Sequence, residues 1–117
     1  MEKITDRIEF AADHYMETGI VFPADMSEED KDRARTELRR IFVQGGYAVA
    51  ALLCSFVDLE GWVRFRNARV GDYMNQYDDD RLKSIAGMAY HQGVADYAQY
   101  INDKLGINIT CISEEDL

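Results

Sequence analysis

The sequence predicts a mainly α-helical single domain, a bundle of about four helices. One observation is the apolar run at 41–57, IFVQGGYAVAALLCSFV, which holds no charged residue and is shorter than a bilayer span of about 20 residues. The other is that the flanking segments carry apolar residues at helical spacing, with charged residues between them. A buried central helix surrounded by amphipathic helices explains both observations. A chain of 117 residues is long enough to bury one such core.

The first amphipathic helix is expected at residues 3 to 18. Its apolar residues recur at the spacing of one helix face: Ile4, Ile8, Ala11 and Tyr15. Gly19 follows the last of them, and glycine is a frequent helix terminator. The short apolar piece Ile20-Phe22 precedes Pro23, which pushes the residue before it toward extended backbone. We therefore expect an extended segment held against the core.

Ser27 opens the second predicted helix, because a serine side chain caps free N–H groups and acidic residues fill the next turn. The inner face of this helix is formed by Ala34, Leu38, Ile41 and Phe42. The pair Gly45-Gly46 interrupts the pattern, and two glycines cost about 2 kcal/mol in a helix interior. This cost favours a bend or break, with 47–57 as the central helix. An unbroken helix that a neighbouring helix approaches closely is the alternative.

The last predicted helix follows an ambiguous segment. Residues 58–70, DLEGWVRFRNARV, fit a short helix and an alternating strand about equally well. From the aspartates at 78–80, which suit the positive end of a helix dipole, a helical pattern runs to a stop at Gly106. Its apolar face is formed by Leu82, Ile85, Ala86, Ala89, Gly93, Tyr97 and Ile101. Gly93 on this face would let another helix come close.

A minor β-element is expected beside the helices. Ile107-Cys111 alternates apolar and polar residues, as a strand does. A lone strand cannot satisfy its backbone hydrogen bonds, so its partner is Ile20-Phe22, Val63-Phe65 or another protein chain. Residues 1–112 then form the domain, and 113–117 form an acidic tail. The ending ISEEDL matches the end of the Myc epitope tag without the upstream residues of that tag, so a native and an added origin both stay open.

The charge balance bears on the partners. The chain has 22 acidic and 13 basic residues, a net charge of −9. This charge repels nucleic acid and anionic membranes and favours basic partners, although solubility alone would also explain it. The charged N-terminus lacks an apolar signal segment, so we expect a cytoplasmic protein. The expected partner is another protein, without direct nucleic-acid or membrane binding, and self-association stays open.

Sequence patterns for catalysis are scarce. Phosphate-binding glycine loops, dinucleotide-binding turns and nucleophile elbows are absent from the sequence. His14 stands three residues before Glu17, which reverses the Glu-x-x-His order of di-iron bundles, and His91 stands near Asp96. The sequence therefore predicts a non-enzymatic protein without a cofactor. The alternative is a small metal- or small-molecule-dependent enzyme that uses His14 and His91.

Two clusters and two tyrosines are the candidate binding residues. Arginines beside aromatic residues suit a protein hot spot or nucleic-acid contacts, or else they pair with acidic residues around a core. The aspartates at 78–80 suit a basic partner, or else they cap a helix. Two tyrosines are expected at an exposed interface, whereas Tyr97 is expected in the core. The candidate set is Trp62, Arg64, Arg66, Arg69, Asp78, Asp79, Asp80, Tyr90 and Tyr100.

In size, acidity and lack of catalytic motifs, the chain resembles phage-encoded inhibitors of host defence, the anti-CRISPR and antirestriction proteins. The resemblance implies a module that occludes a partner's surface, or that mimics DNA by presenting carboxylates to the basic groove of a nucleic-acid-binding protein. The carboxylates that would serve as phosphate mimics are Glu28, Glu29, Asp30, Asp32, Asp78, Asp79 and Asp80. A contiguous acidic face would support mimicry, and a polar pocket beside His14 or His91 would support an enzyme.

Overall fold

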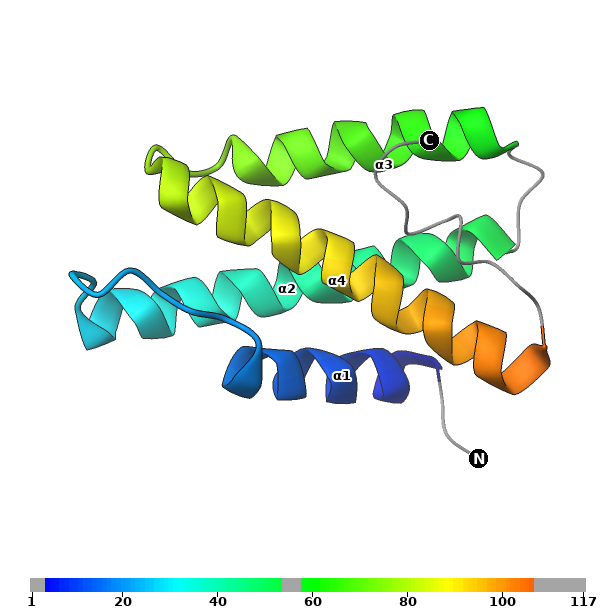
Figure 1. The fold of residues 1–117 in the computed structure, drawn as a ribbon, viewed down its shortest axis with the longest axis horizontal. Helices are drawn as coiled ribbons and strands as arrows, with labels where there is room; N and C mark the ends of the chain where they lie inside the picture. The colour runs from blue at the N-terminus through cyan, green and yellow to red at the C-terminus, as the bar shows by residue number, and fades with distance from the viewer. Residues whose placement is uncertain (1–3, 54–57, 107–117) are drawn as a thin grey trace.

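The computed structural model describes residues 4–53 and 58–106 and places four α-helices in them. They are α1 (Ile4–Thr18), α2 (Glu28–Leu53), α3 (Leu59–Met74) and α4 (Asp80–Leu105). The prediction of a mainly α-helical bundle of about four helices is confirmed. In Figure 1, α4 crosses α2 at the centre, α1 runs along one edge and α3 along the opposite edge. The main interface is that of α2 with α4, whereas α3 packs mostly on α4 and touches α2 little.

Local capping explains where the helices begin and end. The backbone N–H of Asp30 donates to Ser27 Oγ at 3.1 Å, so the predicted cap of α2 is present. Asp58 caps α3 by accepting from the N–H of Gly61 at 2.8 Å. Gly106 ends α4 with a φ of 66°, a left-handed conformation that favours glycine.

The prediction that Gly45-Gly46 breaks the helix is wrong, because α2 continues through both residues. A Cβ atom on Gly45 would overlap the carbonyl oxygen of Tyr90, and one on Gly93 would overlap the carbonyl oxygen of Phe42. The backbones of α2 and α4 are therefore in direct contact at their crossing. Packing gained by this approach offsets the roughly 2 kcal/mol that two glycines cost a helix.

The core is centred on the crossing of α2 and α4 and is covered by α1. Ile8 and Ala12 of α1 are buried against it, and Tyr97 is buried as predicted. The side chains buried at the crossing include Leu38, Ile41, Val49, Ala86, Ala89 and Val94. In the described ranges, 4–53 and 58–106, no helix has an apolar stretch long enough to cross a bilayer.

The predicted strands are wrong wherever the structure describes them. Val63-Phe65 lies inside α3, and Ile20-Phe22 is a connecting segment without strand pairing, although Ile20 and Phe22 pack partly against the core. The helical period of α3 was obscured because Arg66, a charged residue, occupies its inner face four residues after Trp62. Ile107-Cys111 and the tail at 113–117 lie outside the described residues.

Candidate functional site

The predicted arginine-aromatic cluster lies on α3, but its members face in different directions. Trp62 and Arg66 point inward and are 2% and 0% exposed, so a partner cannot reach them in this conformation. Arg64 and Arg69 are exposed on the outer side. The expectation that Tyr90 is exposed is wrong, since it is 1% exposed beneath the same region.

The outer side of α3 borders a groove of about 300 Å³, which we call the α2–α3 groove. The guanidinium of Arg69 lies 5.3 Å from the centre of the Phe65 ring, a cation–π distance. At the base of the groove, burial raises the pKa of Tyr90 to about 12, so its hydroxyl is neutral at physiological pH. The groove is lined by Gln44, Tyr47, Ala48, Ala51, Phe65, Arg69, Tyr73 and Tyr90.

Arg69 differs from most arginines of the chain in its pairing. It makes no ion pair with any residue of 4–53 or 58–106, and its ring contact with Phe65 is cation–π. Arg64, five residues earlier, has its Nη1 atom 3.8 Å from Glu60 Oε1. The guanidinium of Arg69 therefore keeps hydrogen-bond donors available beside an aromatic surface.

Asp79, which immediately precedes α4, makes a capping hydrogen bond and an ion pair with Arg81. Its side chain accepts from the Arg81 N–H at 2.8 Å, and its second oxygen lies 2.8 Å from Arg81 Nη2. The same guanidinium reaches Asp25 at 2.9 Å. These hydrogen bonds from Arg81 lower the pKa of Asp79 to about 2. Asp78 and Asp80 are exposed. Asp79 thus has the capping role that was the alternative to partner binding.

The acidic residues at the start of α2 are interleaved with cations. Lys31 Nζ lies 3.2 Å from Glu28. The two terminal nitrogens of Arg33 lie 3.6 Å from a carboxylate oxygen of Glu29 and of Asp30, respectively. Arg35 Nη1 lies 2.7 Å from Asp32 Oδ1. Each of these four carboxylates therefore has a cation beside it, which locally offsets its negative charge.

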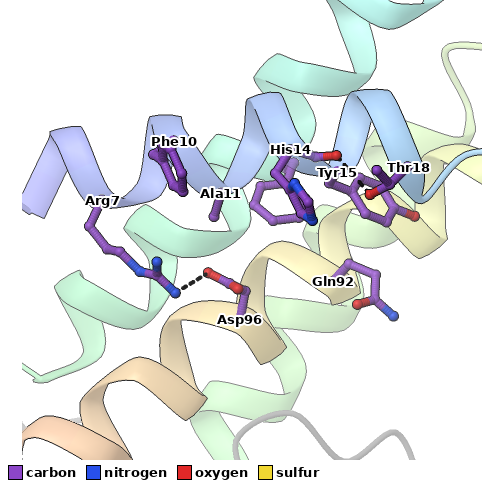
Figure 2. Close-up of a pocket in the computed structure, with 9 residues that line it drawn as sticks. Arg7, Phe10, Ala11, His14, Tyr15, Thr18, Gln92 and Asp96 are labelled. Atoms are coloured by element: carbon purple, nitrogen blue, oxygen red, sulfur yellow. Dashed lines mark hydrogen bonds and ion pairs between the residues drawn. The ribbon is translucent and has the colours of Figure 1, made fainter.

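A second hollow, the α1–α4 pocket, lies beside His14 (Figure 2). It has a volume of about 210 Å³, with side chains of α1 on one side and of α4 on the other. Its lining is Arg7, Phe10, Ala11, His14, Tyr15, Thr18, Phe42, Gln92 and Asp96. His91 is not part of this lining, so the structure does not bring the two histidines to one site.

Opposite charges meet in the α1–α4 pocket. Arg7 Nη2 and Asp96 Oδ2 are 3.7 Å apart, which is an ion pair but too long for a hydrogen bond. Burial raises the pKa of the Asp96 carboxyl, and the nearby Arg7 and His14 partly oppose that rise. The Arg7 guanidinium also lies 4.9 Å from the centre of the Tyr100 ring, so Tyr100, a candidate interface residue, helps to hold Arg7.

Comparison with known proteins gives no relative. No protein-family model, curated protein or solved structure matches this chain. Among the described residues there is also no group of three or more His, Cys, Asp and Glu side chains that could hold a metal ion. The chemistry of the α2–α3 groove and of the α1–α4 pocket is therefore the basis for the function proposed below.

Sequence reasoning missed important residues of both hollows. Tyr73 stands four residues after Arg69. If 58–70 had been taken as part of a helix, this spacing would have placed both residues on the same helix face. Tyr47 reaches the groove from α2, and no sequence pattern links it to α3. The approach of Arg7 to Asp96 likewise joins the first and last helices, 89 positions apart by their residue numbers.

Proposed function

We propose that the protein is a non-enzymatic protein-binding module whose contact surface is the α2–α3 groove. The observation that supports this most is the state of Arg69, an exposed guanidinium without an ion pair among the described residues, set over Phe65 and beside tyrosines. Arginine and tyrosine are the residue types that contribute most often to interface hot spots. Aromatic rings also bury much surface for little loss of conformational entropy.

The groove defines what a partner would place in it. A cavity of about 300 Å³ accommodates one or two side chains rather than a helix. We propose that an apolar partner side chain packs between Tyr47 and Tyr73, while a partner carbonyl or carboxylate accepts hydrogen bonds from Arg69. Burial of such a contact would make Arg69 worth about 2 kcal/mol or more of binding energy.

The partner that we propose has a basic surface around this contact. A net charge of −9 attracts such a surface over distances longer than a hydrogen bond and so speeds encounter. A nucleic-acid-binding protein with a basic groove has a surface of this kind. In this scheme the net charge affects the association rate, whereas the α2–α3 groove affects the dissociation rate.

The biological role that we propose is inhibition of a host defence system by a phage-type protein in the cytoplasm, as for anti-CRISPR and antirestriction proteins. The support for it is the chain's size and acidity. Of the two mechanisms, occlusion of a partner's surface agrees better with the charges than DNA mimicry does. The carboxylates of Glu28 and Asp32 each lie beside a cation, and Arg81 pairs with both Asp25 and Asp79.

A second candidate is a small-molecule-dependent enzyme that uses His14. The observation in its favour is that His14 and Asp96 line the same pocket, where burial raises the pKa of the Asp96 carboxyl (Figure 2). A histidine and a carboxyl of raised pKa suit general acid–base catalysis. Arg7 would then bind an anionic group of the substrate.

The test of the first candidate begins with a pull-down from the native host that identifies the partner. Dissociation of that partner is then measured by surface plasmon resonance for Arg69→Ala and for the matched control Arg64→Ala, an exposed arginine on the same helix. We expect Arg69→Ala to accelerate dissociation by roughly 30-fold or more, because about 2 kcal/mol is lost, and Arg64→Ala to change it little. Equal dissociation rates for the two variants would contradict a hot spot in the groove. Loss of partner binding in His14→Ala instead would move the contact to the α1–α4 pocket.

A further inference from the structure

The two charges in the α1–α4 pocket are only partly satisfied by the protein (Figure 2). The 3.7 Å between Arg7 Nη2 and Asp96 Oδ2 leaves both groups without a mutual hydrogen bond. Within the described residues, Asp96 accepts no hydrogen bond, and the buried Nε of Arg7 has no hydrogen-bond partner. Both side chains are about two-thirds buried, so water replaces these bonds only in part. The pocket therefore offers a donor group and an acceptor group side by side.

We propose that the α1–α4 pocket binds a free α-amino acid in its zwitterionic form. The ligand carboxylate accepts hydrogen bonds from Arg7, and the ligand ammonium donates to the Asp96 carboxylate. In an α-amino acid one carbon atom separates the two charged groups, which matches two pocket charges only 3.7 Å apart. This inference is independent of the protein-binding function proposed for the α2–α3 groove.

A ligand with a single charge fits this pocket less well. An organic anion would pair with Arg7 but would meet the carboxylate of Asp96 and a protein of net charge −9. An amine would pair with Asp96 but would meet the guanidinium of Arg7. A zwitterion pairs with both groups at once and leaves neither like-charge contact.

The rest of the lining indicates which side chain the amino acid carries. An apolar part of the wall is formed by Ala11, Tyr15 and Phe42. The ring centroids of Tyr15 and Phe42 are 5.1 Å apart. Phe10 is 68% exposed at the rim, a position from which it can cover a bound side chain. A volume of about 210 Å³ holds one amino acid of medium size. We therefore expect an aliphatic or aromatic amino acid.

Isothermal titration calorimetry and NMR chemical-shift mapping at pH 7 test the proposal with L-leucine and L-phenylalanine. Two analogues complete the set: 3-methylbutylamine, which is leucine without its carboxylate, and 4-methylpentanoate, which is leucine without its ammonium. We expect at least one of the two amino acids to bind and to shift the amide signals of α1 and α4 around Ala11 and Asp96. Both analogues should bind at least tenfold more weakly than leucine if leucine binds.

Variants separate the two charged contacts. Asp96→Asn should weaken leucine binding at least tenfold while strengthening binding of 4-methylpentanoate, because the like charge is gone. Arg7→Met should show the reverse preference, for 3-methylbutylamine. Asp103→Asn, an exposed position on the same helix, is the matched control and should bind as the parent does. Phe10→Ala should weaken binding without altering the preference for a zwitterion, and its exposed position keeps folding unaffected.

Three results would overturn the proposal. One is the absence of binding by both amino acids up to ~10 mM in the folded parent protein. Another is an analogue that binds as tightly as leucine, which would make this a site for an amine or for an anion. The third is unchanged leucine affinity in Asp96→Asn and in Arg7→Met, because binding would then lie elsewhere.

Discussion

Among single residues, Asp79 connects the start of α4 to the segment before α2. It caps α4 and pairs with Arg81, and Arg81 in turn pairs with Asp25, 56 positions away by their residue numbers. Hydrogen bonds from Arg81 lower the pKa of both carboxyls. A carboxyl whose pKa is lower in the folded state contributes stability while it is ionised. The three residues therefore form a pH-dependent link on the surface.

Replacing Asp79 should reveal this link. Asp79→Ala should lower the melting temperature at pH 7, because the cap and the pair with Arg81 are both lost. The contribution is fully present above the ordinary aspartate pKa near 3.8 and disappears as the pH falls toward the folded value of about 2. Thermal melts of variant and parent should thus differ at pH 7 and converge near pH 2. Asp78→Ala, an exposed neighbour, is the control, and a melting difference of Asp79→Ala that does not depend on pH would contradict the titration of this carboxyl.

At the scale of the helices, the crossing of α2 and α4 depends on glycines that lie directly against the backbone of the facing helix. Gly45 faces the backbone around Tyr90, and Gly93 faces the carbonyl of Phe42. Gly46 faces the side chain of Ile8 on α1, which can shift more easily than backbone. Gly71 on α3 is different, because a Cβ atom there would meet nothing within 4 Å. Glycines with the same intrinsic helix propensity thus differ in what they do: Gly93 makes room for a neighbouring helix, whereas Gly71 makes room for nothing.

Alanine substitutions at two glycines should change stability in opposite directions. Gly93→Ala should lower the free energy of unfolding by about 2 kcal/mol or more, because α2 and α4 have to move apart. Gly71→Ala should raise it by about 0.5 to 1 kcal/mol, because alanine favours a helix and costs no contact here. Urea denaturation of both variants measures these changes. Stabilisation of similar size in the two variants would show that helix propensity rather than the close crossing governs these positions.

At the scale of the whole molecule, several of the described acidic side chains lie in local ion pairs. The pairs of Lys31, Arg33 and Arg35 with the first turns of α2 illustrate this. The chain still produces a long-range field, because its net charge is −9. Such a field influences how fast a basic partner arrives, and it opposes the approach of DNA.

Two measurements test the long-range field. Direct binding of the protein to duplex DNA should be undetectable at physiological salt in a filter assay, and tight, salt-sensitive binding would contradict this.

For the protein partner, the double variant Asp72→Lys/Asp78→Lys should slow association and weaken its dependence on ionic strength. Attraction of this kind is screened within roughly 10 Å at 0.1 M salt. Because both residues are exposed and outside the groove lining, the dissociation rate should stay unchanged.

Features that depend on neighbours along one helix could be predicted from the sequence. The bounds of α1 and α4, the Ser27 cap and the Gly106 stop all follow from residues three to four positions apart or from a single terminal residue. These signals are local because backbone hydrogen bonds and capping bonds connect residues within one turn. The close approach at Gly93 was also expected, since a glycine on the apolar face of a helix leaves room for a neighbouring backbone.

Which helices meet, and which of their residues come together, follows from tertiary packing and could not be predicted from the sequence. The continuity of α2 through Gly45-Gly46 depends on packing by α4, and the inward position of Arg66 depends on the burial of α3 against its neighbours. The ion pair of Arg7 with Asp96 connects two different helices. The lining of the α2–α3 groove likewise comes from more than one helix. Periodicity identifies which face of a helix is buried, but the partner of that face is set by crossing angles and interhelical packing. Both candidate sites lie between helices, and for this reason their composition emerged from the fold.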